Sequence, residues 1–194
     1  MKKIFKLVYQ FKIKLKDIRP PVWRRIQVPE SYTFWDLHVA IQDAFGWEDY
    51  HLHQFELVDP MTGEKIYIGI PDEISNDVLP GWKHKIAKYL SIENPKATYL
   101  YDFGDGWEHS VLLEKILPRE KGVNYPRCIN GKRACPPEDC GGAWGYTEFL
   151  EIIKDPKHEQ HNELLTWVGG DFDPEYFNIE EICFDDPDER LKDL

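Results

Sequence analysis

The chain has 194 residues, of which 42% are hydrophobic and 14% are aromatic. That length and apolar content suit one ordinary domain whose core folds without cross-links. No apolar run approaches the roughly 18 residues of a membrane helix, and Lys6, Gln10 and Lys12 interrupt the apolar start before a signal-peptide core can form. We therefore expect a soluble, cytoplasmic protein without a membrane partner.

Charge is distributed unevenly along the chain. The formal net charge is -11, yet residues 1–30 hold nine basic and two acidic residues, whereas residues 171–194 hold two basic and ten acidic residues. An acidic protein repels phosphate backbones, so nucleic-acid binding would have to use the basic start. We divide the sequence into one domain over residues 1–184 and an acidic tail over residues 185–194.

The first predicted element is a strand over residues 11–15, where apolar residues and lysines alternate with a period of two. Pro20-Pro21 ends this segment, and residues 22–28 are predicted to form its antiparallel partner. Lysines on an exposed edge also prevent association between sheets, and this structural interpretation is favoured. The bases of this region are the candidate surface for a protein or nucleic-acid partner: Lys12, Lys14, Lys16, Arg19, Arg24 and Arg25.

A helix is predicted next, because Thr33 precedes Asp36 by three residues and apolar residues then recur at helical spacing up to Gly46. His38 lies on or beside the apolar stripe and is interpreted as a core or boundary histidine rather than a ligand. Two strands follow, and His51 and His53 share one face of the first. The order β-β-α-β-β is that of a β-grasp, although other α+β folds share it.

Residues 71–82 are expected to form a loop, residues 84–90 a short helix, and TYLYDFGDGWEHSVLLEKI a hairpin with Asp105-Gly106 as its turn. That register places Asp102 opposite His109 on a buried face, where the pair should hydrogen-bond. A carboxylate that holds an imidazole suits a general base or a metal ligand, but it also suits a purely structural pair. With His51 and His53, the pair would form the site of a metal-dependent hydrolase if the strands are neighbours.

Cysteines are concentrated in RCINGKRACPPEDCGG, where Cys128, Cys135 and Cys140 follow the spacing Cys-x6-Cys-x4-Cys. This is not the paired Cys-x2-Cys pattern that makes a zinc assignment specific. Partly buried thiols are favoured over zinc, and zinc over a disulfide, but all three cysteines should lie close together. A zinc ion would need a fourth ligand, and the candidates are His109, which is favoured, Cys183, Glu138 and Asp139. Helices are predicted beyond this segment, over residues 146–153 and 159–168.

Several motifs together resemble the plasmid pRiA4b ORF-3-like family, over about residues 8–182. They are IRPPVWRRIQVP, TFWDLHVAIQDAFGW, HLHQFEL, YLYDFGDGWEH, CINGKRACPPEDCGGAWGY and GGDFDPEYFNIEEI. The resemblance implies a compact α+β domain and no established biochemical activity. Some members are labelled resolvase-like, but this sequence contains no recombinase-type serine or tyrosine site with an arginine cluster.

The sequence therefore predicts a single α+β domain with a mixed or antiparallel sheet, a ββαββ (β-grasp-like) start, a second hairpin and C-terminal helices. The first hypothesis for function is a non-enzymatic binding module, with a link to mobile-element or nucleic-acid biology. The alternative is a metal-dependent hydrolase that uses Asp102, His109, His51 and His53. Zinc is the cofactor considered, and the sequence indicates neither the partner nor the oligomeric state.

Overall fold

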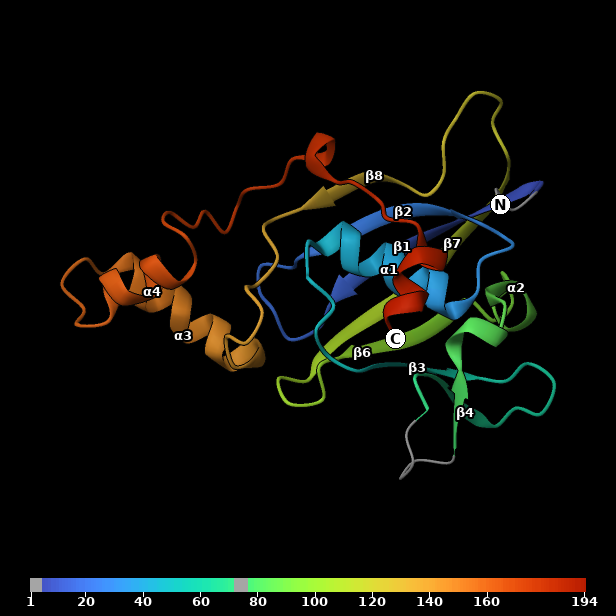
Figure 1. The fold of residues 1–194 in the computed structure, drawn as a ribbon, viewed down its shortest axis with the longest axis horizontal. Coiled ribbons are helices and arrows are strands. Elements are labelled where there is room, and N and C mark those ends of the chain that lie inside the picture. The colour runs from blue at the N-terminus through green and yellow to red at the C-terminus, as the bar shows by residue number, and fades with distance from the viewer. Residues whose placement is uncertain (1–4, 72–76) are drawn as a thin grey trace.

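The computed structural model describes residues 5–71 and 77–194, which form one α+β domain around a single mixed sheet (Figure 1). The described strands follow the order β5-β4-β3-β6-β7-β1-β2-β8. Neighbouring strands are antiparallel, except that β4 and β5 are parallel. The strands are β1 (Leu7–Leu15), β2 (Trp23–Pro29), β3 (His53–Val58), β4 (Lys65–Gly69), β5 (Val78–Pro80), β6 (Lys96–Tyr101), β7 (Trp107–Pro118) and β8 (Arg127–Lys132).

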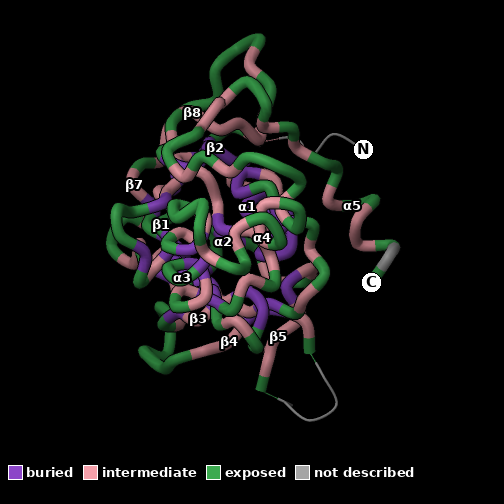
Figure 2. The backbone as a smooth tube through the Cα atoms, turned by 90° about the vertical axis from the view of Figure 1, so that its left-hand side faces the viewer, coloured by how far each residue is buried: buried purple, intermediate pink, exposed green. Residues whose placement is uncertain are grey.

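One face of the sheet is buried and the other faces solvent. In β7, Trp107 is buried and its neighbour Glu108 is exposed, as expected for an antiparallel sheet with one wet face. Helix α1 (Phe34–Phe45) covers the buried face, where the rings of Phe34 and Phe55 lie 5.1 Å apart. The buried segments consequently gather between α1 and the sheet, while the outer loops are exposed (Figures 1 and 2).

The ends of α1 confirm the prediction from sequence. The Asp36 backbone amide donates to Thr33 Oγ1 over 3.1 Å, and the Thr33 amide donates to Asp36 Oδ2 over 2.8 Å. These reciprocal bonds form a capping box, which satisfies amides that the first helical turn leaves without partners. Gly46 ends the helix in a left-handed conformation, with φ of 82°.

The β-grasp interpretation is not confirmed, although the order β-β-α-β-β is present. The two N-terminal hairpins, β1–β2 and β3–β4, do not pair with each other. The later hairpin β6–β7 is inserted between them, so that β6 pairs with β3 and β7 pairs with β1. Strand β7 therefore joins the two halves into one broad sheet.

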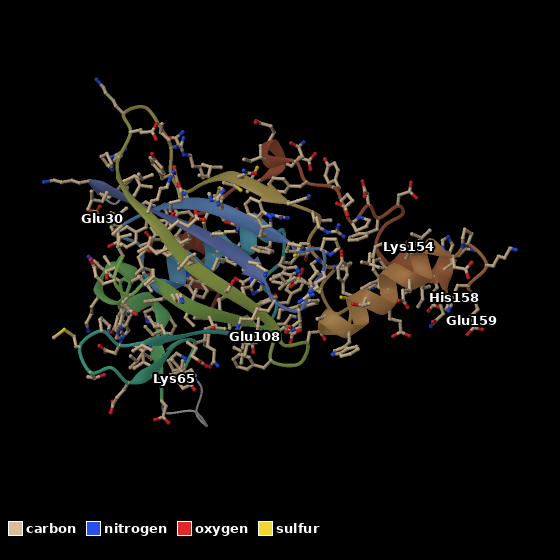
Figure 3. All side chains as sticks on the ribbon, turned by 180° about the vertical axis from the view of Figure 1, so that it is seen from behind. Glu30, Lys65, Glu108, Lys154, His158 and Glu159 are labelled. Carbon is tan, nitrogen blue, oxygen red and sulfur yellow. The ribbon has the colours of Figure 1, made fainter. Side chains whose placement is uncertain are left out.

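The remaining helices are α2 (Ile86–Tyr89), α3 (Gly142–Lys154), α4 (His161–Trp167) and α5 (Pro187–Arg190), with 3-10 turns η1 (Gly81–Lys83), η2 (Ile179–Glu181) and η3 (Leu191–Asp193). Of these helices, α5 packs on α1 and the others lie outside the region that α1 covers. Helices α3 and α4 project from one end of the sheet, and Lys154, His158 and Glu159 lie at the tip of this pair (Figures 1 and 3). Part of the loop expected over residues 71–82 lies outside the described residues. No described helix has both the length and the apolar character needed to cross a membrane.

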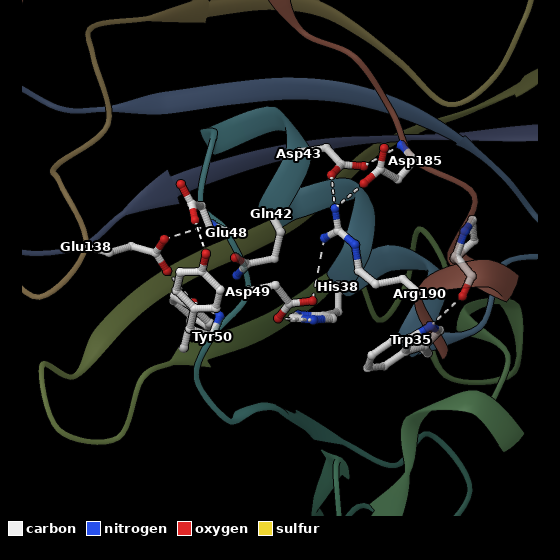
Figure 4. A network of polar contacts seen from close by, with 12 residues as sticks. Trp35, His38, Gln42, Asp43, Glu48, Asp49, Tyr50, Glu138, Asp185 and Arg190 are labelled. Atoms are coloured by element: carbon white, nitrogen blue, oxygen red, sulfur yellow. Dashed lines mark hydrogen bonds and ion pairs between the residues drawn. The ribbon is translucent and has the colours of Figure 1, made fainter. Parts of the chain in front are cut away.

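The C-terminal segment returns to α1, where Trp35 Nε1 donates to the Pro187 carbonyl oxygen over 2.9 Å (Figures 1 and 4). The predicted acidic tail is thus packed on the helix that covers the sheet. The lysines of β1 point to the solvent-facing side of the sheet, whereas α1 covers the other face.

Candidate metal centre

Helix α1 holds His38 completely buried, facing β6 of the sheet. His38 Nδ1 lies 2.8 Å from the hydroxyl of Tyr99, and the same hydroxyl accepts a hydrogen bond of 2.8 Å from Gln42 Nε2. Gln42 is one helical turn beyond His38, so both side chains project from the same face of α1. The Tyr99 hydroxyl therefore fixes the orientation of the imidazole through Nδ1 and leaves Nε2 for another contact.

Two further residues contact the His38 ring, one at Nε2 and one on its face. Asp49, in the loop between α1 and β3, places Oδ1 2.9 Å from His38 Nε2. His53, the first residue of β3, stacks on His38 with ring centroids 3.4 Å apart and planes inclined by 8°. One potential ligand atom of each residue lies within 4.8 Å of the other two. His38 comes from a helix, Asp49 from a loop and His53 from a strand.

The surroundings of this cluster keep both imidazoles neutral. Burial lowers the pKa of His38 and the pKa of His53 well below the usual value for histidine. Burial has the opposite effect on Asp49 and raises the pKa of its carboxyl to about 6. Arg190 partly offsets that effect, because its Nη1 lies 3.5 Å from Asp49 Oδ2 while its Nη2 contacts Asp43 at 2.8 Å (Figure 4).

The predicted pairing of Asp102 with His109 is wrong. Strand β6 ends at Tyr101 and strand β7 begins at Trp107, and these two residues are paired across the hairpin. In the same register, His109 is paired with Tyr99. Asp102 begins the turn with a left-handed φ of 54°, and its carbonyl oxygen accepts from Gly106 N over 2.7 Å. The turn therefore spans residues 102–106 rather than only Asp105-Gly106, because Asp tolerates the left-handed region and its side chain caps a nearby amide.

His109 is buried among aromatic rings and does not reach His53. The Tyr99 ring lies between them, with its centroid 6.0 Å from that of His53 and 5.3 Å from that of His109. His109 Nδ1 lies 3.1 Å from the Trp107 carbonyl oxygen, and burial lowers the pKa of His109 to about 3. The four residues of the expected hydrolase cluster, His51, His53, Asp102 and His109, thus do not converge on one point.

His51 and Asp102 instead belong to a second group, which includes Asp139. His51 Nε2 lies 3.1 Å from Asp139 Oδ1 and 3.8 Å from Asp102 Oδ2. This group lies at the end of the sheet from which α3 starts, and His51 and Asp139 are partly open to solvent. The loop between α1 and β3 thus serves both groups, with Asp49 in one and His51 in the other.

The cysteines do not form the zinc site with His109 that was the alternative to partly buried thiols. Cys128 lies on β8 and His109 on β7, with β1 and β2 between them, so three strand spacings of ~4.8 Å separate their backbones. Among the described residues, the three thiols of Cys128, Cys135 and Cys140 do not gather into a metal-binding group either. All four cysteines are free, and burial raises the pKa of Cys140 to about 12. Protonated thiols are poor ligands and poor nucleophiles.

The predicted basic surface is divided between engaged and solvent-facing side chains. Lys16 forms an ion pair of 2.7 Å with Glu108, and Arg25 forms one of 2.7 Å with Glu114. Arg24 is buried and donates to the Ala44 carbonyl oxygen over 2.8 Å. Lys12 Nζ lies over the Trp23 ring, 4.9 Å from its centroid, and Lys14 and Arg19 are exposed.

Comparison with known proteins places these groups in a family. Residues 7–181 match the model of the plasmid pRiA4b ORF-3-like proteins. The chain belongs to that family. This pRiA4b ORF-3-like chain is 37% identical, over 179 residues, to the uncharacterized protein y4hQ of Sinorhizobium fredii. The alignment covers 90% of this chain and 88% of y4hQ. The chain also resembles the crystal structure of a protein of unknown function, MM3350 from Methanosarcina mazei, with 52% identity, a TM-score of 0.89, and coverage of 93% of this chain and 100% of that one.

Both groups of potential ligands lie within the residues that match the pRiA4b ORF-3-like model. Arg190, which contacts Asp49, lies beyond that range. The fold of this chain is similar to that of MM3350, and neither relative's name states an activity.

From the sequence, His38 is interpreted as a core or boundary histidine, and Asp49 is not predicted as a ligand. The spacing of four residues between His38 and Gln42 does indicate that both side chains project from one face of a helix. Asp49, His51 and His53 recur at every second residue, but in the structure His51 belongs to the other group. No local pattern specifies how α1 packs on the loop and strand that carry them.

Proposed function

We propose that the protein binds a divalent transition-metal ion between His38, Asp49 and His53. The observation that carries this proposal is the state of His53, which is 1% exposed while neither ring nitrogen has a hydrogen-bond partner among the described residues. A buried imidazole without a partner costs about 1–3 kcal/mol, because its N–H group loses water and gains nothing. A bound ion would give one of these nitrogens a partner, provided that one of the two stacked rings, now inclined by only 8°, turns so that both in-plane lone pairs point at the ion.

The chemistry of the three groups supports an ion of the zinc and iron class. Two imidazoles and one carboxylate are the ligands preferred by Zn²⁺, Fe²⁺ and similar ions. The pKa of each histidine is lowered by burial, so both are neutral and their nitrogen lone pairs are available near pH 7. Three protein ligands leave coordination positions for water, and a dication acidifies such a water and can generate a nucleophile.

The residues around the cluster are of the kind that orient metal ligands. With an ion on His38 Nε2, Nδ1 must carry the proton and donate it to the Tyr99 hydroxyl. The Tyr99 hydroxyl then needs an acceptor, and rotation of the Gln42 amide by half a turn would present Oε1, which has no hydrogen-bond partner among the described residues. Arg190 would limit the mobility of Asp49 from the opposite side.

Metal content and stability test the proposal together. The wild-type chain should retain zinc or iron through gel filtration in elemental analysis, and His53→Gln should lose one equivalent per chain. His84→Gln is the matched control, because His84 bonds to the Tyr89 hydroxyl at 2.6 Å and belongs to neither group. Saturating Zn²⁺ at 100 times its dissociation constant should stabilise the wild type by about 2.7 kcal/mol.

Two results would contradict the proposal. One is equal metal content in wild type and His53→Gln after loading with Zn²⁺. The other is a wild-type melting temperature that neither EDTA nor added Zn²⁺ changes. Either outcome would make the stacked pair of His38 and His53 a packing element of the core.

A further inference from the structure

We propose that His51, Asp102 and Asp139 form a second divalent-cation site, which is open to solvent and distinct from the buried cluster. One potential ligand atom of each residue lies within 4.8 Å of the other two. The residues come from the loop before β3, the turn between β6 and β7, and the loop before α3. Three segments far apart in sequence therefore present a nitrogen and two carboxylates to one point.

The backbone at this point holds the two carboxylates in place. Asp102 and Asp139 both have left-handed backbones, with φ of 54° and 58°. Asp102 Oδ1 accepts from the Gly104 amide over 2.8 Å, which directs Oδ2 toward His51. The carboxylate is thus fixed through one oxygen and offers the other.

The turn between β6 and β7 and the loop before α3 also contact each other directly. Gly141 N donates to Asp105 Oδ2 over 3.0 Å. At Gly142, a Cβ atom would lie only 2.3 Å from the Asp105 carbonyl oxygen, so glycine is needed for this close approach. Asp139 is consequently held against the turn that carries Asp102, and the separation of the two carboxylates is a property of the fold.

Electrostatics favour a cation between these carboxylates. In the described part of the chain, neither Asp102 nor Asp139 forms an ion pair with a lysine or an arginine, and His51 is the partner of both. Although His51 Nε2 lies near both carboxylates and is shielded from solvent, it makes no hydrogen bond among the described residues. The side chain of Asp102 is 11% exposed, so a charge at this point is screened less than it would be on the open surface. A dication would satisfy all three groups at once.

The ligand set indicates which ions would bind. Two carboxylates and one imidazole suit Mn²⁺, Zn²⁺ and Fe²⁺, and the carboxylate majority favours Mn²⁺ more than the buried cluster does. The side chain of Asp139 is 68% exposed, so coordination positions on that side face water. Asp139 also lines a cleft of about 600 Å³ with Tyr50, Glu138 and Trp167, whereas His51 and Asp102 do not line it.

The experiment separates this site from the buried one by using the His53→Gln chain, in which the proposed function predicts that the first site is lost. Titration of that chain with Mn²⁺, followed by electron paramagnetic resonance of the free ion, should show one remaining equivalent. Adding Asp139→Asn should raise the dissociation constant at least tenfold. The control is Asp17→Asn, another exposed aspartate with a left-handed backbone, with φ of 59°, and it should change nothing.

The outcomes are decisive even if His53→Gln does not fold. In the wild-type chain, Asp139→Asn should lower the number of bound Mn²⁺ ions by one relative to Asp17→Asn, whether or not the buried cluster is loaded. Equal Mn²⁺ binding by the two variants would overturn the second site and leave the buried one untouched. Loss of binding in His53→Gln with full binding in Asp139→Asn would also assign the ion to the buried cluster alone.

Discussion

The buried imidazole of His109 makes the stability of the fold depend on pH. The rings of Phe45 and Trp47 meet it edge-on, at centroid distances of 5.0 and 5.3 Å, and burial lowers its pKa to about 3. In the unfolded chain its pKa is about 6.5. Above that pH neither state is protonated, whereas below it only the unfolded state binds the proton. The contribution of His109 to stability is therefore lost progressively as the pH falls from about 6.5 toward 3.

The size of this effect between pH 7 and pH 5 follows from the two pKa values. Proton binding to the unfolded state over this interval destabilises the fold by about 2 kcal/mol. We expect His109→Gln to lower stability at pH 7 through lost packing, but to remove this pH-dependent part. Urea unfolding at both pH values, with EDTA present, should show a decline from pH 7 to pH 5 that is smaller by about 2 kcal/mol in the variant than in the wild type.

A control separates titration from packing. Phe45→Leu disturbs the same cluster of rings without removing a titratable group, so its decline from pH 7 to pH 5 should equal that of the wild type. If His109→Gln and wild type decline equally, within about 0.5 kcal/mol, then the folded state must accept a proton on His109, and the reasoning from burial fails.

Three further outcomes are expected. Arg190→Met should lower the free energy of unfolding, measured in urea titrations, by about 1–3 kcal/mol, because it leaves the nearly buried Asp43 carboxylate without its cation. Unchanged stability would mean that the C-terminal contact is not maintained in solution. Gly142→Ala should cost at least about 1 kcal/mol more than Gly122→Ala, since both have left-handed backbones but only Gly142 would clash, and equal melting temperatures would refute the close approach. Any binding of DNA to the surface that carries Lys14 should be weak and should fade between 50 and 200 mM salt, as expected for phosphate contacts. Lys14→Glu should weaken it further. Binding that persists in high salt would point to another surface.

Local patterns in the sequence predicted the elements well where one physical signal dominated. The capping residues Thr33 and Gly46 placed both ends of α1 correctly, because each satisfies backbone groups within one turn of the helix. Alternation likewise identified β1, although it begins at Leu7, four residues before the predicted start. Strand β8 was missed, because its residues 127–132 contain a glycine and little apolar alternation. It is instead ordered by its pairing with β2.

The register of the β6–β7 hairpin shows where local reasoning fails. The dipeptide Asp105-Gly106 is a strong signal for a two-residue turn, but Asp102 also adopts a left-handed conformation and starts the turn earlier. The two interpretations differ by three residues in register, which moves His109 from Asp102 to Tyr99. Because that shift is odd, it also changes which residues of β6 share a face with those of β7. The predicted site was lost through a single turn residue.

The candidate ligands emerge from packing between elements rather than from any one motif. His53 is buried because β3 lies in the middle of the sheet, and His38 is stacked on it because α1 crosses that strand. The loop that connects them must then close over the pair, and Asp49 takes a left-handed conformation, with φ of 65°, at the point of closure. The same short connection turns His51 outward, toward Asp102 and Asp139. One loop of seven residues, 46–52, thus carries a residue of the buried polar cluster and a residue of the open one. An ion bound at either site would therefore restrain the backbone that supplies a ligand to the other.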